Sequence, residues 1–295
     1  MSKINKLTNP LVEVFGFPVG NMSDKAKRYR TKRLCPFNNK VPNCTKDKAN
    51  NPLGVCSIRH GNRAVITCPT RFRQDWLIIE NAANFAFGDK SNWTSLSEIK
   101  LVDKNGQSAG NIDFVLVEYD NNGRITNFAS LEVQGVYISG NLRNPFESFI
   151  KNPTKDFVWT SAYNYPKPDY LSSSRKRLIP QILYKGGIFK AWKKKQIIAL
   201  QNSFYKTLPN LPETTVDKAD IAWFLYDLEL DKKLNQYNLF LSKTIYTEFE
   251  PAMRKVTSPI PGDISNFIDN LQSKLDKHLD NNSPDTPSLS DIISK

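Results

Sequence analysis

Apolar residues recur along the chain in runs that predict strands. Residues 111–120 (NIDFVLVEYD) and 125–138 (ITNFASLEVQGVYI) are rich in Val, Ile and Phe, as strands usually are. Between them lie Asn122 and Gly123, a dipeptide typical of tight hairpin turns because both residues tolerate a positive φ. The two segments therefore predict an antiparallel hairpin. Further strands are expected in a hairpin that turns at His60, Gly61 and Asn62, and over residues 219–230 and 236–246.

Other segments have the three- and four-residue spacing of helices. Residues 74–90 place Trp76, Ile79, Ala83 and Phe87 on one stripe, which predicts a helix that packs on the core. Strands and helices in mixed order predict an α/β fold. Helices are also expected over residues 95–102, over residues 178–208 with an interruption at Gly186 and Gly187, and over residues 263–280, ahead of a disordered tail.

The composition is that of a globular protein with a strong positive charge. The chain has 295 residues, 39% of them hydrophobic, with a net charge of +12 and a pI near 9.4. Residues 1–80 contain fifteen Lys or Arg against five acids, and residues 170–212 contain nine Lys or Arg and no acid. Two basic blocks favour a polyanionic partner, because neutralised phosphates release counterions. Nucleic acid is favoured over an anionic membrane surface because the sequence contains no strong amphipathic anchor.

The sequence contains no predicted membrane span and no secretory signal. No run of about eighteen apolar residues occurs, and the N-terminal residues lack the apolar middle of a signal peptide. We therefore expect a cytoplasmic protein.

All four cysteines lie close together in the sequence. Cys35, Cys44, Cys56 and Cys68 are separated by eight, eleven and eleven residues, and the rest of the chain has none. Four thiolates suit a closed tetrahedral site for zinc or for a single iron, although these gaps match no common zinc pattern. Unrelated buried thiols and, less readily in a reducing compartment, disulfides are the alternatives.

The hairpin of residues 111–138 also carries acids. A two-residue loop at Asn122 and Gly123 would place Asp113 directly opposite Glu132, with Gln134 on the same face as Glu132. Two carboxylates so close repel one another unless a cation lies between them, and a hard divalent ion is the usual one. Both acids are flanked by apolar residues, which favours a site over the alternative of a half-solvated polar face.

These motifs together resemble a known nuclease family. An Asp on one strand followed by Glu-x-Lys on the next is the pattern of the PD-(D/E)XK nucleases, and Gln134 takes the position of the Lys. With the segments EVFGFPVGNMS, LCPFN, CTKD, PLGVCSI and ITCPTRF ahead of Asp113 and LEVQ, the chain resembles the NotI family of restriction endonucleases over most of residues 11–250.

The resemblance implies an architecture. We expect a PD-(D/E)XK nuclease core, with a central mixed sheet flanked by helices, behind an N-terminal four-cysteine metal-binding region. The expected domains are residues 1–73 for the metal-binding region, 74–257 for the catalytic core, and 258–295 for an acidic C-terminal helix and tail.

The resemblance also implies a function and roles. It implies a prokaryotic type II restriction endonuclease that acts as a homodimer and cleaves duplex DNA with Mg²⁺, leaving 5′-phosphate and 3′-hydroxyl ends. Asp113 and Glu132 would hold the ion, Gln134 would be catalytic, and Glu98 would be an additional active-site acid. The four cysteines, Cys35, Cys44, Cys56 and Cys68, would bind a structural iron, with zinc as the alternative. The rival hypotheses are a non-catalytic metal-stabilised DNA-binding protein, a structure-specific repair nuclease of the same superfamily, and an RNA-binding protein.

The basic blocks supply candidate DNA contacts, with an ordinary solvated face as the alternative for each block. The first candidates are Arg175, Lys176, Arg177, Lys193, Lys194 and Lys195, and the second are Arg71 and Arg73.

Overall fold

The computed structural model describes residues 9–38, 41–48, 50–88 and 91–280. The chain divides into two compact units, residues 1–256 and residues 257–295. The domain boundary that we expect at residue 73 lies inside the first unit and stays a prediction.

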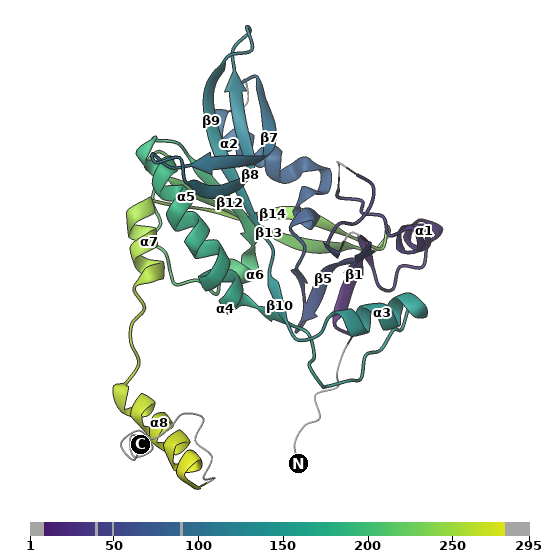
Figure 1. Cartoon of the computed structure of the whole chain (residues 1–295). Coiled ribbons are helices and arrows are strands. Elements are labelled where there is room, and N and C mark those ends of the chain that lie inside the picture. The colour runs from purple at the N-terminus through teal and green to yellow at the C-terminus, as the bar shows by residue number, and fades with distance from the viewer. Residues whose placement is uncertain (1–8, 39–40, 49, 89–90, 281–295) are drawn as a thin grey trace. The chain divides into compact units, whose positions relative to one another are not determined.

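A six-stranded mixed sheet forms the centre of the first unit (Figure 1), in the order β14-β13-β12-β9-β8-β7. Strands β9, β12 and β13 run parallel, and the other neighbours pair antiparallel. The expected mixed α/β architecture is confirmed by this arrangement. The strands are β7 (Trp93–Val102), β8 (Ser108–Tyr119), β9 (Ile125–Gln134), β12 (Gln196–Gln201), β13 (Ile221–Asp231) and β14 (Gln236–Thr247).

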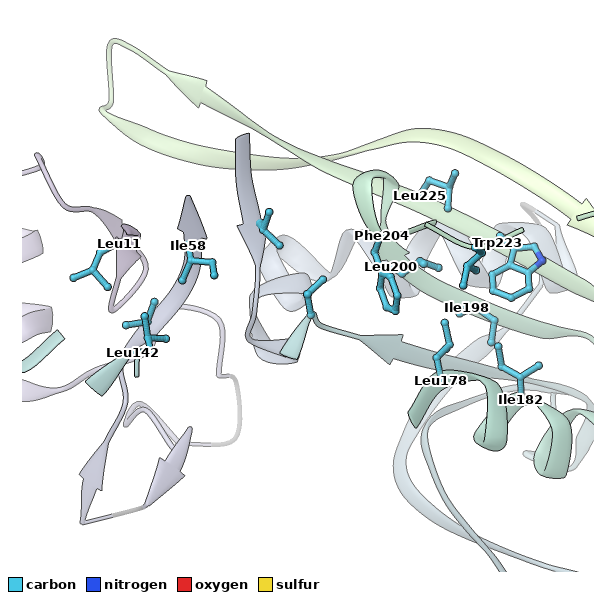
Figure 2. Packing of buried hydrophobic residues seen from close by; sticks show 14 of the residues in the cluster. Leu11, Ile58, Leu142, Leu178, Ile182, Ile198, Leu200, Phe204, Trp223 and Leu225 are labelled. Carbon is cyan, nitrogen blue, oxygen red and sulfur yellow. The ribbon is translucent and has the colours of Figure 1, made fainter. Parts of the chain in front are cut away.

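Helices cover both faces of the sheet, because the buried strand β12 has apolar side chains on both sides. Ile197 packs with α2 (Leu77–Phe87) on one face. Ile198 packs with Ile182 of α5 (Ile179–Ala191) on the other face, as Figure 2 shows. The short helix α6 (Asn202–Tyr205) and α7 (Phe249–Thr257) add Phe204 and Met253 to this second cluster.

Our prediction for residues 178–208 is wrong in two respects. Helix α5 continues through Gly186, where a Cβ would come within 2.7 Å of the Phe249 ring, so glycine serves close packing there. Residues 196–201 then form β12 instead of a helix. Six consecutive buried residues cannot distinguish a buried parallel strand from a buried helix by periodicity. Before α5 lie α4 (Tyr170–Ser173) and a π-helical turn (Ser174–Leu178).

A smaller antiparallel sheet, in the order β2-β1-β5-β6, is formed by the N-terminal residues. His60 pairs with Arg63 in it, which confirms the predicted hairpin turn. Its last strand joins the central sheet, because the amide of Ile66 donates to Oε1 of Gln201 at 2.8 Å. The elements in and around it are β1 (Leu11–Val14), β2 (Phe17–Pro18), α1 (Asp24–Lys32), β3 (Asp47–Lys48), β4 (Asn51–Pro52), β5 (Val55–His60), β6 (Arg63–Ile66), a 3-10 segment (Pro69–Trp76), β10 (Tyr137–Ser139), α3 (Arg143–Lys151) and β11 (Lys167–Asp169).

The second unit contains the helix α8 (Ile264–Asp280), which confirms the helix expected over residues 263–280. The tail that we expect beyond it lies outside the described residues. None of the helices described is both long and apolar enough to span a membrane.

Candidate active site

Two acidic residues of the β8–β9 hairpin, Asp113 and Glu132, lie on the sheet face that α5 covers. Phe114 pairs with Leu131, as the predicted register requires, and the neighbouring pair in that register is Asp113 and Glu132. Glu132 is also level with Ile198 of β12, whose side chain packs against α5. Because side chains alternate along a strand, Asp113, Glu132 and Gln134 share this face.

The hairpin turn is longer than the predicted two residues. Strand β8 ends at Tyr119 and β9 begins at Ile125, with a register shift beside the turn. The carboxylate of Asp120 accepts hydrogen bonds from the amides of Asn122 and Arg124, both at 2.9 Å. This Asp side chain closes a wider turn, and the shift restores the predicted pairing farther along the strands.

Glu132 is a buried acid with one satisfied oxygen. Its side chain is about 4% exposed, and Oε1 accepts a hydrogen bond from Nζ of Lys185 at 2.8 Å. Within the described part of the chain, the buried Oε2 has no hydrogen-bond partner. Burial raises the pKa of Glu132 to about 7, although Lys185 opposes the shift. A carboxylate with a free buried oxygen is a ready ligand for a cation.

Asp113 is half-buried beside Glu132. Its Oδ2 accepts a hydrogen bond from the amide of Val133 at 2.8 Å, which fixes the carboxylate across the strand pair. Burial raises the pKa of Asp113, while that hydrogen bond and the positive charges of Lys185 and Arg73 lower it. The charge of Lys185 therefore acts on both acids.

Gln134 and Asp113 open onto a cleft of about 860 Å³. Nε2 of Gln134 donates to the carbonyl of Gly135 at 2.6 Å, so the amide is held at the end of β9. The cleft is also lined by residues just after the N-terminal sheet, from α5 and from the segment after β10, among them Thr67, Pro69, Gln181, Asn141 and Arg143.

Our prediction of a helix around Glu98 is wrong. Residues 93–102 form the edge strand β7, and the residues on either side of Glu98 pair with those on either side of Asp113. Glu98 itself has φ of 57° and is exposed, and its charge raises the pKa of Asp113. Glu98 therefore lies on a strand, opposite Asp113 of the neighbouring strand. Its left-handed backbone conformation interrupts the alternation of side chains along β7.

Sequence reasoning missed Lys185. This residue comes from α5 and is the direct partner of Glu132, yet it is a single Lys in an otherwise apolar segment, LYKGGIF. Only the packing of α5 against β9 brings the two side chains together. The only hint in the sequence of a functional role for Lys185 was its charge on a helix face whose other residues are apolar.

The carboxylates of this site suit Mg²⁺, which takes some of its ligands from water, better than a metal ion whose ligands are all protein side chains. Mg²⁺ commonly binds one or two carboxylates and takes its remaining oxygens from water and phosphate. Asp113 and Glu132 can supply two carboxylates of that kind. Across the residues with a described structure, no three His, Cys, Asp or Glu side chains form an arrangement that could hold a metal ion.

The four cysteines are held in two pairs by the backbone. Cys35 and Cys44 follow the two residues of an antiparallel bridge, and the amide of Cys68 donates to the carbonyl of Cys56 at 3.3 Å. All four are free thiols. Burial raises the pKa of Cys35 to about 11, and the nearby Cys68 and Cys44 raise it as well. Burial also raises the pKa of Cys56, with Cys68 and Cys35 adding to the shift. Among the described residues, the cysteines do not form a metal-binding arrangement as they stand.

Comparison with known proteins identifies the family. The family model described as restriction endonuclease NotI matches residues 20–239. The chain belongs to the NotI restriction endonuclease family. No match is found among curated proteins. The matched segment includes all four cysteines, the β8–β9 acids and Lys185. As a member of the NotI family, the protein is a type II restriction endonuclease, a site-specific deoxyribonuclease whose substrate is DNA. Restriction endonucleases of this kind generally use Mg²⁺.

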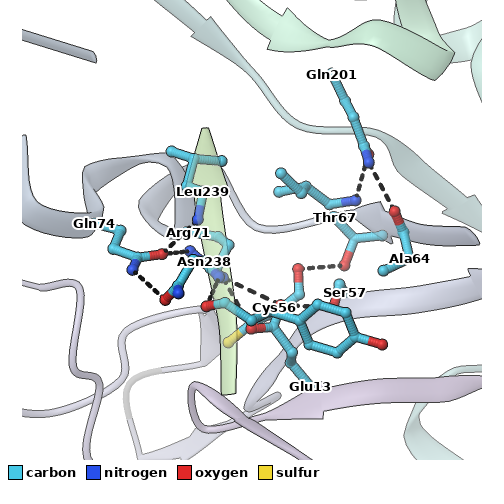
Figure 3. A network of polar contacts seen from close by, with 12 residues as sticks. Glu13, Cys56, Ser57, Ala64, Thr67, Arg71, Gln74, Gln201, Asn238 and Leu239 are labelled. Carbon is cyan, nitrogen blue, oxygen red and sulfur yellow. Dashed lines mark hydrogen bonds and ion pairs between the residues drawn. The ribbon is translucent and has the colours of Figure 1, made fainter. Parts of the chain in front are cut away.

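For a NotI-family enzyme the positions of the basic residues matter, and Arg71 is not where we expect it. Arg71 is fully buried, and Nε donates to Glu13 at 3.0 Å. Its other nitrogens donate to Gln74 at 2.8 Å and to the carbonyl of Tyr237 at 2.9 Å (Figure 3). The guanidinium is therefore part of the core and has no free face for a phosphate, which corrects that prediction.

Arg73, by contrast, is not enclosed in the core. It is half-buried, with its guanidinium carbon 5.1 Å from the centre of the Phe114 ring, and its charge lowers the pKa of Asp113. The expected role of Arg73 as a DNA contact stays a prediction.

The residues of the second basic block lie in two separate places. Arg177 is exposed and stacks on the ring of Tyr137, at 3.6 Å, beside the cleft. Residues 193–195 instead precede β12 beside Ser130, in the middle of β9, about 13 Å of strand away from Gln134. Nζ of Lys194 already donates to Asn127, at 2.7 Å. Arg177 therefore lies beside the cleft, with Arg175 and Lys176 in the same π-helical turn, whereas Lys193, Lys194 and Lys195 lie farther along the sheet.

Proposed function

We propose that this NotI-family enzyme hydrolyses both strands of a specific DNA sequence in a Mg²⁺-dependent reaction, with the β8–β9 hairpin as its cleavage site. The observation that carries the proposal is the half-buried Asp113 next to the buried Glu132 beside the cleft, with the Glu132 Oε2 left without a partner among the described residues. Buried acids with free oxygens persist in proteins mainly where they bind a cation.

The roles of the residues follow from their chemistry. Asp113 and Glu132 would hold the ion, which polarises a scissile phosphate and makes hydroxide available near neutral pH. Gln134 does not titrate, so its amide would orient a water molecule by hydrogen bonding. Glu98, opposite Asp113, would position the ion or bind a second one. Arg73 would offset negative charge between the acids and the DNA backbone.

The architecture proposed with this function is the PD-(D/E)XK core in its Glu-x-Gln form. The strand-borne acids on a mixed sheet with helices on both faces support it. We also propose that two copies act together, since a pseudo-symmetric duplex is cut on both strands by a two-fold dimer. The cut ends would carry a 5′-phosphate and a 3′-hydroxyl.

We further infer that Cys35, Cys44, Cys56 and Cys68 together bind one structural metal ion, iron or alternatively zinc. The clustering of the four cysteines in the sequence and the raised pKa values of the Cys35, Cys44 and Cys56 thiols support this inference, because metal binding would stabilise the thiolates that burial disfavours. The ion would order the N-terminal residues that border the cleft.

The test of the cleavage site is to separate chemistry from binding. The variants Asp113→Asn, Glu132→Gln and Gln134→Ala are assayed for cleavage of a sequenced viral genome with Mg²⁺ and for gel-shift affinity with Ca²⁺. Either acid variant is expected to lose several orders of magnitude in rate while still binding DNA. Gln134→Ala is expected to lose roughly ten- to a thousandfold.

The matched control is Glu118→Gln, a carboxylate on the same hairpin that instead accepts a hydrogen bond from Ser91. It should cleave like the wild type, at the same discrete positions. Wild-type cleavage by Asp113→Asn or Glu132→Gln would contradict the proposal. Melting curves for all variants distinguish loss of chemistry from loss of fold.

A further inference from the structure

A buried lysine contacts the proposed ion ligand Glu132. Nζ of Lys185 lies 2.8 Å from Oε1 of Glu132 and also donates to the carbonyl oxygen of Asn111. The side chains of Lys185 and Glu132 are both about 4% exposed. Lysine is seldom buried unless it is paired, and burying both charges has a large desolvation penalty. The pair therefore calls for an explanation beyond stability.

Lys185 approaches the site from the helix side. Gln181, one helical turn earlier on α5, lines the same cleft as Asp113, so this stripe of the helix faces the site. The stem of Lys185 passes close to Gly110, where a Cβ would lie 3.5 Å from the lysine Cε. The lysine thus occupies a fitted position between α5 and β8.

The pair differs from a purely structural ion pair. Lys190, on the same helix, is about 37% exposed and pairs with Asp220 at 2.8 Å at the surface. In the Lys185 pair only one carboxylate oxygen is used, and Oε2 of Glu132 stays buried without a partner among the described residues. A pair that served stability alone would be expected to satisfy both oxygens.

We propose that Lys185 is a positioning residue of the cleavage site. It holds Oε1 of Glu132 so that Oε2 is the oxygen presented to the ion, and it supplies from a helix the positive charge that the neutral Gln134 does not supply from the strand. This inference rests on the proposed role of Glu132 as an ion ligand. Partners that orient ligands in this way typically account for 10- to 100-fold in metal affinity or activity.

The experiment uses the full-length protein and four variants, Lys185→Met, Lys185→Arg, Glu132→Gln and the double variant of Glu132→Gln with Lys185→Met. Lys190→Met is the matched control, because it removes a lysine and an ion pair from the same helix away from the site. The readouts are the single-turnover cleavage rate with Mg²⁺, the gain in gel-shift DNA affinity on adding Ca²⁺, and the melting temperature.

Lys185→Met should lower both the cleavage rate and the Ca²⁺-dependent gain in affinity by roughly 10- to 100-fold. Lys185→Arg should recover much of both, because it keeps the charge. Adding Lys185→Met to Glu132→Gln should change the Ca²⁺ response no further, since the lysine acts through Glu132. Lys190→Met should match the wild type.

Three results would overturn the proposal. The first is a Lys185→Met variant as active as Lys190→Met, and the second is a double variant with a weaker Ca²⁺ response than Glu132→Gln alone. The third is a Lys185→Arg variant no better than Lys185→Met in folded protein. If Lys185→Met fails to fold, the double variant, which no longer buries an unpaired charge, provides the decision. Wild-type cleavage by Glu132→Gln would instead refute the cleavage site itself.

Discussion

Replacing Arg71 by Met should lower the free energy of unfolding without removing a contact to DNA. The guanidinium donates to both oxygens of Glu13, at 3.0 and 3.1 Å, and to Gln74 and the carbonyl of Tyr237 (Figure 3). Methionine keeps most of the volume and removes every one of these donors. The perturbation is therefore electrostatic and polar, with little change in packing.

The size of the effect follows from the partner left behind. Glu13 is fully buried, and after the change the hydroxyl of Ser57, at 2.7 Å, still donates to it. Removing one member of a buried ion pair typically costs about 3–5 kcal/mol, because the remaining charge is uncompensated. A domain is commonly stable by about 5–15 kcal/mol, so this loss is a large fraction of the total. Combining Arg71→Met with Glu13→Gln should recover part of it.

The assay is urea unfolding, with gel-shift affinity measured on the folded protein. Arg73→Ala is the matched comparison, since that half-buried guanidinium lies over Phe114 and is not enclosed in the core. It should change the free energy of unfolding by less than about 1 kcal/mol and weaken DNA binding or cleavage. An Arg71→Met variant with wild-type stability and reduced DNA affinity would refute the reasoning, as would an unstable Arg73→Ala.

Three further outcomes are expected. Elemental analysis should find one iron or zinc per chain, and Cys56→Ala should lower both metal content and melting temperature; metal-free protein that is folded and active would contradict this. Alanine at residues 175–177 should reduce the salt slope of DNA binding by about 0.9 for each phosphate that the protein no longer neutralises, while alanine at residues 193–195 should leave the slope unchanged. In metal-free protein, kept so by a chelator, the pKa of Glu132 is about 7 in the folded state against 4.5 in the unfolded state. The contribution of Glu132 to the free energy of unfolding is therefore complete below pH 4.5 and is lost as the pH rises through 7. The melting temperature of Glu132→Gln should not show this fall with pH. The same pH profile in variant and wild type would contradict the prediction.

The sequence predicted features that depend on local pattern. Alternation along β8 and β9 predicted the hairpin and the pairing of Phe114 with Leu131, and hence the neighbouring positions of Asp113 and Glu132. The wider turn did not change this, because the register shift lies beside the turn. The hairpin at His60 and the helix α8 were predicted for the same reason, since their signals lie within a few consecutive residues.

Features fixed by distant contacts were not predictable in this way. Strand β12 has the apolar run of a buried helix, and only pairing with β9 and β13 makes it a strand. Arg71 has the composition of a basic surface, but its partner Glu13 lies 58 residues away. Lys185 meets Glu132 across 53 residues. In each case the interaction that fixes the structure leaves no local pattern in the sequence. Counting charges therefore could not show that Arg71 is buried or that Lys185 lies beside Glu132.

The positions of the two proposed metal sites suggest that one supports the other. The amide of Val136, just after β9, donates to the carbonyl of Ile66 at 2.9 Å, so the end of the Glu-x-Gln strand is tied to the N-terminal sheet. Thr67 and Pro69, on either side of Cys68, line the same cleft as Gln134. A metal held by the cysteines would therefore fix one wall of the cleft, while the central sheet fixes the acids on the other. Because metal binding is coupled to local order, loss of the ion should impair the geometry of cleavage before it unfolds the central sheet.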